Sequence, residues 1–461
     1  MSKYSLKELA GFMGGELYGN DMLVSGFSID SRTLKNGDVF FCIKGENYDG
    51  HDFIDDCLKK SSCIVSSREI NPIDLNKKSY IKVKDTLEAL KKASEYVRSK
   101  CSAKFIAITG SNGKTTVKEM LAHILSNHKI SYTKGNLNNH IGVPLTLLSI
   151  NNDDEFVIVE CGSNNLGEIK PLSKLIKPNI AAVTNIGYAH IEGFKTLNNT
   201  AKEKYSIFDY IQNDGLAVIN IEDKYCDNIN LRNKIFFGYS INFRKKFKKI
   251  IKNLFYKTIF LSVSPREENC FEIEYKGKKE LIKINLNGKH NILNAACACS
   301  IALSLNIKFE EIKNKIETFD SVNSRLKLYN LKKNISIIDD CYNANPSSFK
   351  AAISYLADLK GNKIILMGDM AELGKNSKHF HEEIGIYAQK NGVSKFLSIG
   401  NHSKYASSIF GENGHHFTDK ESLKSYLNNN IEPSSYILIK GSRNQKLEEY
   451  VNFLKKRERG N

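Results

Sequence analysis

The stretch FIAITGSNGKTTVKEML, residues 105–121, constrains the fold most strongly, because it places a glycine-rich turn between an apolar run and a helix-like run. At a helix start, the backbone N–H groups of Gly110 to Thr115 would hold phosphate oxygens. The Lys114 amine would reach the outer phosphates, and the Thr115 hydroxyl would bind Mg²⁺. The common nucleoside triphosphate loop has an earlier glycine, where this chain has Ile108. The stretch predicts a variant phosphate-binding loop, and a glycine turn without a ligand is the alternative.

Strand-like segments around this loop indicate an α/β fold. Those in the central part of the chain alternate with helical segments, which predicts a mostly parallel sheet with helices on both faces. With 461 residues the chain exceeds one hydrophobic core, so more than one domain is expected. We predict a small N-terminal α/β domain over residues 1–100, the central domain over 101–320 and a second α/β unit over 321–461.

Several strands of the predicted central sheet end in polar clusters, namely TGSNGKTT, ECGSNN and TNIGYAH. Ligands bind at the carboxyl ends of strands in such sheets. Glu160 in the second cluster suits a magnesium ligand or a group that orients water, although a surface acid is the simpler reading. His190 in the third cluster is either a ligand or a structural histidine. The ligand reading gains weight only because its strand also ends at the same sheet edge.

Weaker signals come from two other segments. LNGKHNILNAACACSIAL, residues 286–303, puts Asn291 and Asn294 at a helix start, where they could read an adenine edge or Asn291 could cap the helix. In the third block, Arg325 could neutralise a phosphate and Asp340 could bind ribose hydroxyls.

The formal net charge of +16 fits nucleic acid, a membrane surface or anionic small substrates. The densest basic run, residues 243–257, is best read as a solvated face, since no known nucleic-acid module is recognisable around it. The ten cysteines show no C-x-x-C pair, which fits reduced thiols in the cytoplasm. Neither a signal peptide nor a long apolar run is found, so a cytoplasmic protein without membrane insertion is expected.

Residues 109–116 match the T-G-x-N-G-K-T-T loop of the Mur ligase family, the ATP-dependent amino-acid ligases of cell-wall synthesis. The chain resembles this family in all three blocks. Further matching stretches are SIDSR and IKGENYDGHDFI near the start, KGNLNNHIGVPLTLL, AHIEGF, DCYNANPSS and MGDMAELG. The resemblance accounts for the missing early glycine of the phosphate-binding loop.

The resemblance implies three domains, of which the first binds a UDP-sugar, the second binds ATP and the third, Rossmann-like, brings the incoming amine. It implies an ADP-forming ligase that adds D-alanyl-D-alanine to UDP-N-acetylmuramoyl-tripeptide through an acyl phosphate. That reaction belongs to peptidoglycan precursor synthesis and so bears on cell shape and division. The expected partners are these two substrates and no nucleic acid, and a monomer is expected.

The resemblance also assigns roles to individual residues. ATP would contact Gly110, Asn112, Gly113, Lys114, Thr115, Thr116, Asn294, Arg325 and Asp340. Two magnesium ions would be held by Thr115, Glu160, His190 and Lys204, and the catalytic residues would be Lys114, His190, Lys204 and Arg325. The UDP-muramoyl substrate would lie near Ser31, Arg32, Asn138 and Asn139.

Lys204 matches the carbamylated lysine of the family, and an unmodified surface lysine or Lys202 in its place are the alternatives. The chain departs from the family after Glu160, where Gly-Ala and a His-Pro pair are common and this chain reads CGSNNLGEI. The changed positions are Cys161, Ser163, Asn165 and Leu166. A sister ligase, a nucleotide-binding regulator and a nucleic-acid binder are rival interpretations.

Overall fold

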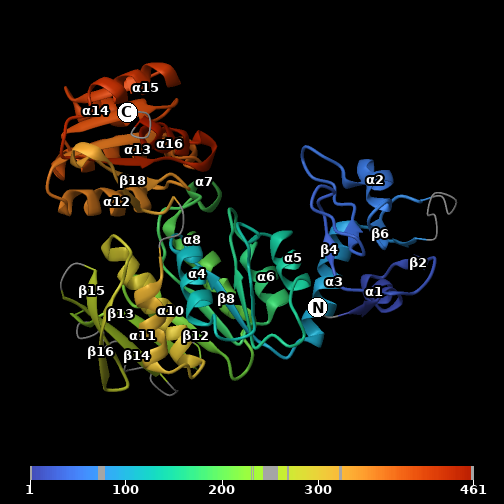
Figure 1. Ribbon diagram of the computed structural model, residues 1–461. Helices are drawn as coiled ribbons and strands as arrows, with labels where there is room; N and C mark the ends of the chain where they lie inside the picture. Colours follow the sequence, from blue (N-terminus) through green and yellow to red (C-terminus); the bar gives the residue numbers. More distant parts are fainter. Residues whose placement is uncertain are drawn as a thin grey trace.

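The structure is a computed structural model that describes residues 3–70, 78–229, 231, 233–241, 258–266, 269–320 and 324–457. It contains three main sheets, and each sheet packs with helices of its own (Figure 1). We call these three parts the N-terminal, central and C-terminal domains. The α/β fold class is confirmed. The basic run 243–257 lies outside the described residues, and the boundaries near residues 100 and 320 stay predictions.

The N-terminal domain has a five-stranded sheet in the order β2-β7-β6-β5-β4, and all its pairings are parallel except that of β2 with β7. A short pair, β1 and β3, lies beside it. Asp85 caps α3, the helix that leads into the central domain. The elements are β1 (Tyr4–Ser5), α1 (Leu6–Met13), β2 (Glu16–Tyr18), β3 (Leu23–Val24), β4 (Phe27–Ser28), β5 (Val39–Phe41), α2 (Ile54–Leu58), β6 (Cys63–Ser66), β7 (Ser79–Lys82) and α3 (Thr86–Lys100).

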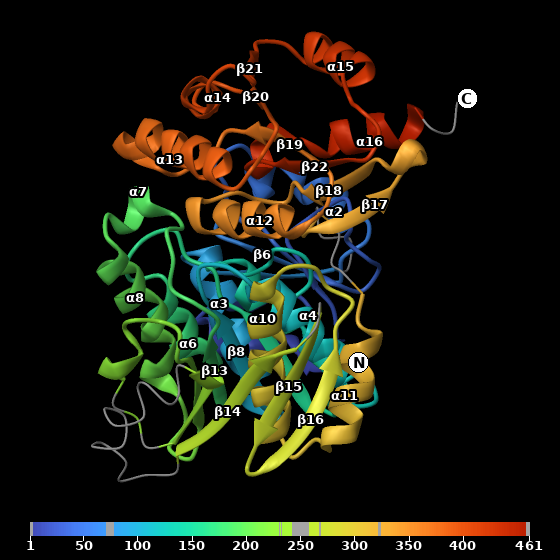
Figure 2. The same ribbon diagram turned by 90° about the vertical axis from the view of Figure 1, so that its left-hand side faces the viewer.

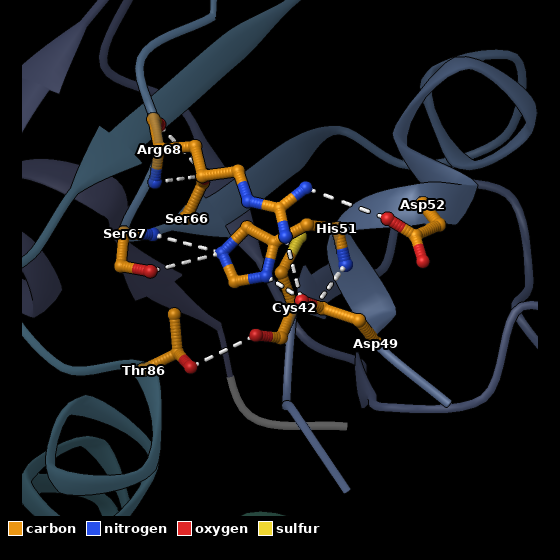
Figure 3. A network of polar contacts seen from close by, with 8 residues as sticks. All are labelled: Cys42, Asp49, His51, Asp52, Ser66, Ser67, Arg68 and Thr86. Atoms are coloured by element: carbon orange, nitrogen blue, oxygen red, sulfur yellow. Dashed lines mark hydrogen bonds and ion pairs between the residues drawn. The ribbon is translucent and has the colours of Figure 1, made fainter. Parts of the chain in front are cut away.

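A polar network explains the YDGHDF stretch of this domain (Figure 3). The buried His51 ring lies 2.6 Å from Asp49 Oδ1 through Nδ1 and 3.0 Å from the Ser67 hydroxyl through Nε2. Arg68 donates to the other Asp49 oxygen at 2.7 Å. The network therefore ties the turn after β5 to the end of β6.

The central sheet has the order β16-β15-β14-β13-β12-β11-β8-β10-β9 and is parallel from β9 to β14. Neighbouring residues of β8 point to different cores, with Phe105 on one face and Ile106 on the other. A strand buried on both faces reads as a continuous apolar run, as FIAIT does. The strands are β8 (Lys104–Thr109), β9 (Ile130–Tyr132), β10 (Phe156–Glu160), β11 (Ile180–Val183), β12 (Leu216–Asn220), β13 (Lys234–Tyr239), β14 (Thr258–Pro265), β15 (Cys270–Tyr275) and β16 (Lys278–Lys283).

Helices cover both faces of this sheet, as expected from the sequence. Val117 of α4 and Ala295 of α10 belong to one core, and Val143 of α5 and Ile169 of α6 belong to the other. The helices are α4 (Lys114–Ile124), α5 (Gly142–Leu148), α6 (Ile169–Ile176), α7 (Ile191–Phe194), α8 (Leu197–Tyr205), α10 (Lys289–Ser304) and α11 (Phe309–Thr318).

The C-terminal sheet has the order β17-β18-β22-β19-β20-β21, and only β17 pairs antiparallel. This is the second α/β unit that the sequence predicts. Its elements are β17 (Lys327–Asn330), β18 (Ser336–Asp340), α12 (Pro346–Asp358), β19 (Asn362–Gly368), α13 (Ser377–Lys390), β20 (Lys395–Ile399), α14 (Lys404–Phe410), β21 (Gly414–Phe417), α15 (Lys420–Asn429), β22 (Ser435–Lys440) and α16 (Glu448–Arg457).

The C-terminal domain meets the central domain at α7 and α12, on the side that also carries the carboxyl ends of the central strands (Figures 1 and 2). Ile191 of α7 is buried in the C-terminal core, together with Met370 and Leu373. Part of the domain interface is therefore apolar and packed.

Two observations bear on the class of protein. Within the described part of the chain, no helix is long and apolar enough to cross a membrane. All ten cysteines are free thiols, and nine of them are buried.

Candidate active site

The phosphate-binding loop lies between β8 and α4, where two glycines are required by close contacts. Gly110 has φ 148° and Gly113 has φ 82°. A Cβ on Gly110 would lie 2.0 Å from Thr184 Oγ1, and one on Gly113 would lie 2.2 Å from Asn294 Oδ1. Larger residues are therefore excluded at both positions. The packing around the loop accounts for a glycine at position 110 and another at position 113.

The segment after β11 braces this loop. The Asn112 N–H donates to Asn185 Oδ1 at 3.0 Å, and the Asn112 carbonyl accepts from Asn185 Nδ2 at 2.8 Å. The Ser111 hydroxyl donates to the Gly187 carbonyl at 3.0 Å. The polar clusters after β8 and β11 thus form one rigid unit at the sheet edge, as their shared position predicted.

Lys114 begins α4 and donates to the Gly110 carbonyl at 2.8 Å. Burial lowers the pKa of its amine, and the nearby Arg325 charge lowers it further, while Glu160 opposes the shift. A polyanion bound in the loop would favour the charged amine again, because an opposite charge stabilises the protonated form.

Glu160 ends β10 and is 2% exposed. Its Oε2 accepts from the Thr115 hydroxyl at 2.9 Å, and its Oε1 accepts from Asn138 Nδ2 at 2.8 Å. Arg325 Nη2 donates to the same Thr115 hydroxyl at 3.1 Å. A hydroxyl oxygen and the carboxylate oxygens therefore lie close together, and these are ligands that Mg²⁺ prefers.

Lys118 is a site residue that the sequence reasoning missed. Its side chain is fully buried, and its Nζ lies 3.9 Å from Glu160 Oε2 and donates to the Thr133 carbonyl at 2.7 Å. The available signal was its place one helical turn after Lys114, on the face of α4 that packs against β10.

Arg325 reaches the loop from the start of the C-terminal domain. Its guanidinium lies 4.2 Å above the Tyr342 ring. Among the described residues its buried Nε has no hydrogen-bond partner. A buried donor of this kind is costly unless a further group accepts from it, and the contact of Arg325 with a phosphate stays a prediction.

Lys114, Thr115, Glu160 and Arg325 line a cavity of about 750 Å³ between the central and C-terminal domains. Besides the contact of Arg325 with Thr115, hydrogen bonds of the NANPSS stretch cross the boundary beside this cavity. Asn345 Nδ2 donates to Asn112 Oδ1 at 2.8 Å, and the Tyr188 N–H donates to the Ser347 hydroxyl at 3.1 Å. The NANPSS stretch therefore contacts the phosphate-binding loop and the turn after β11.

His190 lines the cavity, but its Nδ1 pairs with Glu372 of the MGDMAELG stretch. This contact holds the pKa of the Glu372 carboxyl below its ordinary value. Within the described part of the chain, no group of three or more His, Cys, Asp or Glu residues is placed to hold a metal. The two residues expected to bind a second magnesium, His190 and Lys204, each pack against the Phe194 ring and are engaged with other partners.

Lys204 is 1% exposed, and its Nζ donates to the Ser163 hydroxyl at 2.8 Å. Burial and the nearby Lys114 charge lower its pKa to about 7. Lys204 is therefore not a surface lysine, whereas Lys202 of the same helix is exposed.

At the opposite wall, Asn294 packs against Gly113 and donates to Asn291 Oδ1 at 2.8 Å. The alternative that Asn291 caps the helix is wrong, since the N-cap of α10 is Gly288. Asp340 lines the cavity, but Lys440 donates to its Oδ2 at 2.5 Å. Its expected contact with ribose stays a prediction.

The expected substrate residues divide into two groups. Asn138 and Asn139 lie in the cavity wall. Neither Ser31 nor Arg32 is among the described residues that line it, and the Arg32 guanidinium, 86% exposed, is paired with Asp30. The structure thus leaves the N-terminal pair outside this cavity, and their role stays a prediction.

Comparison with known proteins agrees with this geometry. The Mur ligase middle domain matches residues 108–302, the Mur ligase glutamate ligase domain matches 324–443, and the Mur ligase family catalytic domain matches 23–98. The chain is 36% identical over 98% of both chains to the UDP-N-acetylmuramoyl-tripeptide–D-alanyl-D-alanine ligase of Buchnera aphidicola. It is 35% identical to the enzyme of that name from Escherichia coli, over 98% of this chain and 99% of the other. A crystal structure of MurF from Acinetobacter baumannii superposes with a TM-score of 0.86, at 26% identity over 98% of both chains. The chain therefore belongs to the Mur ligase family.

Proposed function

We propose that this protein is an ATP-dependent, ADP-forming ligase that joins D-alanyl-D-alanine to the terminal carboxylate of UDP-N-acetylmuramoyl-tripeptide. The observation that carries the proposal is the convergence of Lys114, Arg325 and the Thr115–Glu160 pair on one interdomain cavity. Relatives of that name at 36% and 35% identity over almost the whole chain support the choice of substrates.

The residues present fit ATP and one magnesium ion. The start of α4 and the Lys114 amine suit the phosphates, and the Thr115 and Glu160 oxygens suit the metal, since Mg²⁺ in proteins commonly combines one or two carboxylates with substrate phosphates. When bound, Mg²⁺ would neutralise charge on the transferred phosphoryl group. A second ion at His190 would require the imidazole to leave Glu372, so it has less support.

The first step would transfer the γ-phosphoryl group to the substrate carboxylate, giving an acyl phosphate and ADP. The γ-phosphate, the leaving ADP and the attacking carboxylate are all anions. Lys114 and the Arg325 guanidinium would offset their repulsion, which is the main catalytic demand of phosphoryl transfer. Both cations are already held in place by neighbouring residues, so little reorganisation would be needed.

The second step would be attack of the D-alanyl-D-alanine amine on the acyl carbon, with loss of phosphate and a proton. Acyl phosphates hydrolyse, so water must be excluded while the amine arrives. The contacts of Asn345 and Ser347 with the central domain would serve this purpose by holding the cavity closed.

A carbamate on Lys204 has no support from the comparisons. The pKa of about 7 would leave part of the amine neutral, as carbamylation requires, but an unmodified amine also explains the contact with Ser163. Intact-mass measurement under bicarbonate, together with restoration of Lys204→Ala activity by short carboxylic acids, decides between the two. An unmodified mass and no restoration would remove the carbamate from the proposal.

We also propose a cytoplasmic, monomeric enzyme of peptidoglycan precursor synthesis, with effects on cell shape and division. The reduced, mostly buried thiols support the location. Sedimentation of the purified protein tests the oligomeric state.

The decisive experiment measures ADP release with a panel of UDP-muramoyl peptides and amine acceptors. We expect release only when ATP, UDP-N-acetylmuramoyl-tripeptide and D-alanyl-D-alanine are all present. Turnover with a free single amino acid but not with the dipeptide would indicate a sister ligase. If saturating substrates released no phosphate, a nucleotide-binding regulator would be the better interpretation.

A further inference from the structure

Glu203 is a buried carboxylate that none of the steps above uses. It belongs to α8 and is 3% exposed. It accepts three backbone hydrogen bonds, from the N–H groups of Gly167 at 2.6 Å, Glu168 at 3.0 Å and Ile169 at 2.7 Å. Removal of this carboxylate would take the partner from all three N–H groups, and the Ile169 N–H among them is buried.

These three donors form the entrance to α6, whose N-cap residue makes no side-chain cap of its own. The carboxylate of Glu203 therefore caps α6 from another helix, and its charge is favourable at this end of the helix dipole. The position of the loop before α6, residues 161–168, is consequently set by α8.

Glu168, whose N–H is held by Glu203, in turn holds residues that line the cavity. The Glu168 side chain accepts from the Asn164 N–H at 2.8 Å and from Asn165 Nδ2 at 3.0 Å. Ser163, Asn164 and Glu168 all line the cavity. The chain departs from the usual Mur ligase pattern in this segment, and two of the changed residues, Ser163 and Asn165, make contacts that hold it.

Two neighbouring elements hold the same loop. Lys204, next to Glu203 on α8, donates to Ser163. A Cβ on Gly193 of α7 would lie 2.0 Å from the Asn164 carbonyl, so α7 packs directly on the loop. The loop is therefore in contact with both α7 and α8.

The loop adjoins the segment that carries Asn138. A Cβ on Gly162 would lie 2.8 Å from Asn138 Oδ1. The loop does not carry the residue expected to contact adenine. That residue, Asn294, belongs to α10 and packs against Gly113. The loop therefore borders the part of the cavity left for the UDP-muramoyl peptide.

We propose that Glu203 is a positioning residue that orders residues 161–168 for binding of the peptide substrate. This inference rests on the proposed ligase function. Glu203 touches no reacting atom, and it acts through the backbone of the loop.

The test compares Glu203→Ala, Glu203→Gln and the matched control Lys202→Ala, which changes an exposed residue of the same helix. Glutamine keeps Oε1, which serves two of the three donors, and replaces Oε2 by an NH₂ group that opposes the Gly167 N–H. Hydrogen exchange is measured on the unliganded protein for a peptide that covers residues 161–176. Steady-state ADP release then gives KM for ATP and for UDP-N-acetylmuramoyl-tripeptide.

For Glu203→Ala we expect exchange in this peptide to become about tenfold faster or more, which corresponds to the loss of charge-assisted hydrogen bonds. KM for the UDP-peptide is expected to rise about tenfold while KM for ATP stays within about twofold. The exchange rate and the KM for the UDP-peptide of Glu203→Gln should lie between those of the alanine variant and wild type. Lys202→Ala should have the exchange rate and the KM values of wild type.

Unchanged exchange in residues 161–176 would overturn the proposal, and so would an equal rise of both KM values. If Glu203→Ala does not fold, the same criteria apply to Glu203→Gln. Wild-type protein that turns over no UDP-peptide would refute the ligase function instead, and hydrogen exchange would still report whether Glu203 orders the loop.

Discussion

Helices α4 and α6 both begin at the carboxyl edge of the central sheet, but their N-termini are satisfied differently. The N-cap of α4 is Gly113, which offers no side chain to the first-turn N–H groups. The start of α6 receives the buried Glu203 carboxylate. Both ends attract anions, because unsatisfied N–H groups and the helix dipole are positive there.

This difference explains how the same sheet edge provides separate places for the nucleotide and for the other substrate. An N-terminus that already holds a protein carboxylate cannot also bind phosphate, so the nucleotide is directed to α4. The second loop is instead a fixed wall for the other substrate. Substitutions in and around the two loops test this contrast.

Lys114→Ala removes the cation of the first loop. We expect ADP release to fall about 10³-fold, because the charge on the transferred phosphoryl group loses its nearest protein cation. Thermal unfolding should remain cooperative, since the hydrogen bonds of this amine go to the loop carbonyls of Gly110 and Ser111. Near-normal turnover would contradict the assignment of this loop.

Lys204→Met tests the second loop through pH-dependent stability. The folded pKa of Lys204 is about 7, and its usual value is 10.5. Between these values the unfolded chain binds the proton and the folded protein does not, so the stability of wild type rises with pH. Below pH 7 both states bind it, and this contribution is constant.

Denaturant unfolding from pH 7 to 10 should therefore show a steeper rise for wild type than for Lys204→Met, with a difference of about 3 kcal/mol across the range. Parallel pH profiles would show that Lys204 stays charged in the folded protein.

Glu160→Gln tests the residue that links the first loop, through Thr115, to the segment that carries Asn138. The variant keeps the side-chain shape but loses the charge that favours a divalent cation. The magnesium concentration for half-maximal activity is expected to rise about 30-fold. An unchanged magnesium dependence would place the metal elsewhere in the cavity.

Asn345→Ala tests how the C-terminal domain braces the first loop. Loss of its hydrogen bond to Asn112 should lower kcat about fivefold, in line with one neutral hydrogen bond. Asn391→Ala, on the same domain and outside the described cavity lining, is the control. Equal effects of the two changes would show that the loss is not specific to this contact.

Sequence reasoning was accurate where the signal is local. The strand before Gly110, the helix after it and the clusters containing Glu160 and His190 were found because apolar runs and polar turns are consecutive in the chain. The position of these clusters at one edge of the sheet could be predicted because their strands are parallel. The partners of these residues were not predictable, because Glu372 and Asn345 reach the site only after the C-terminal domain docks.

The fold class, the variant phosphate-binding loop and the membership of the family could be inferred from the chain alone, since they depend on short-range patterns of glycine, charge and apolar residues. The burial of Lys204 against Ser163, the position of Lys118 beside Glu160 and the capping of α6 by Glu203 arise only when the helices and sheets pack. These properties depend on burial and on contacts between distant segments. Neither the pKa of an amine nor the partner of a carboxylate is specified until the helices have packed.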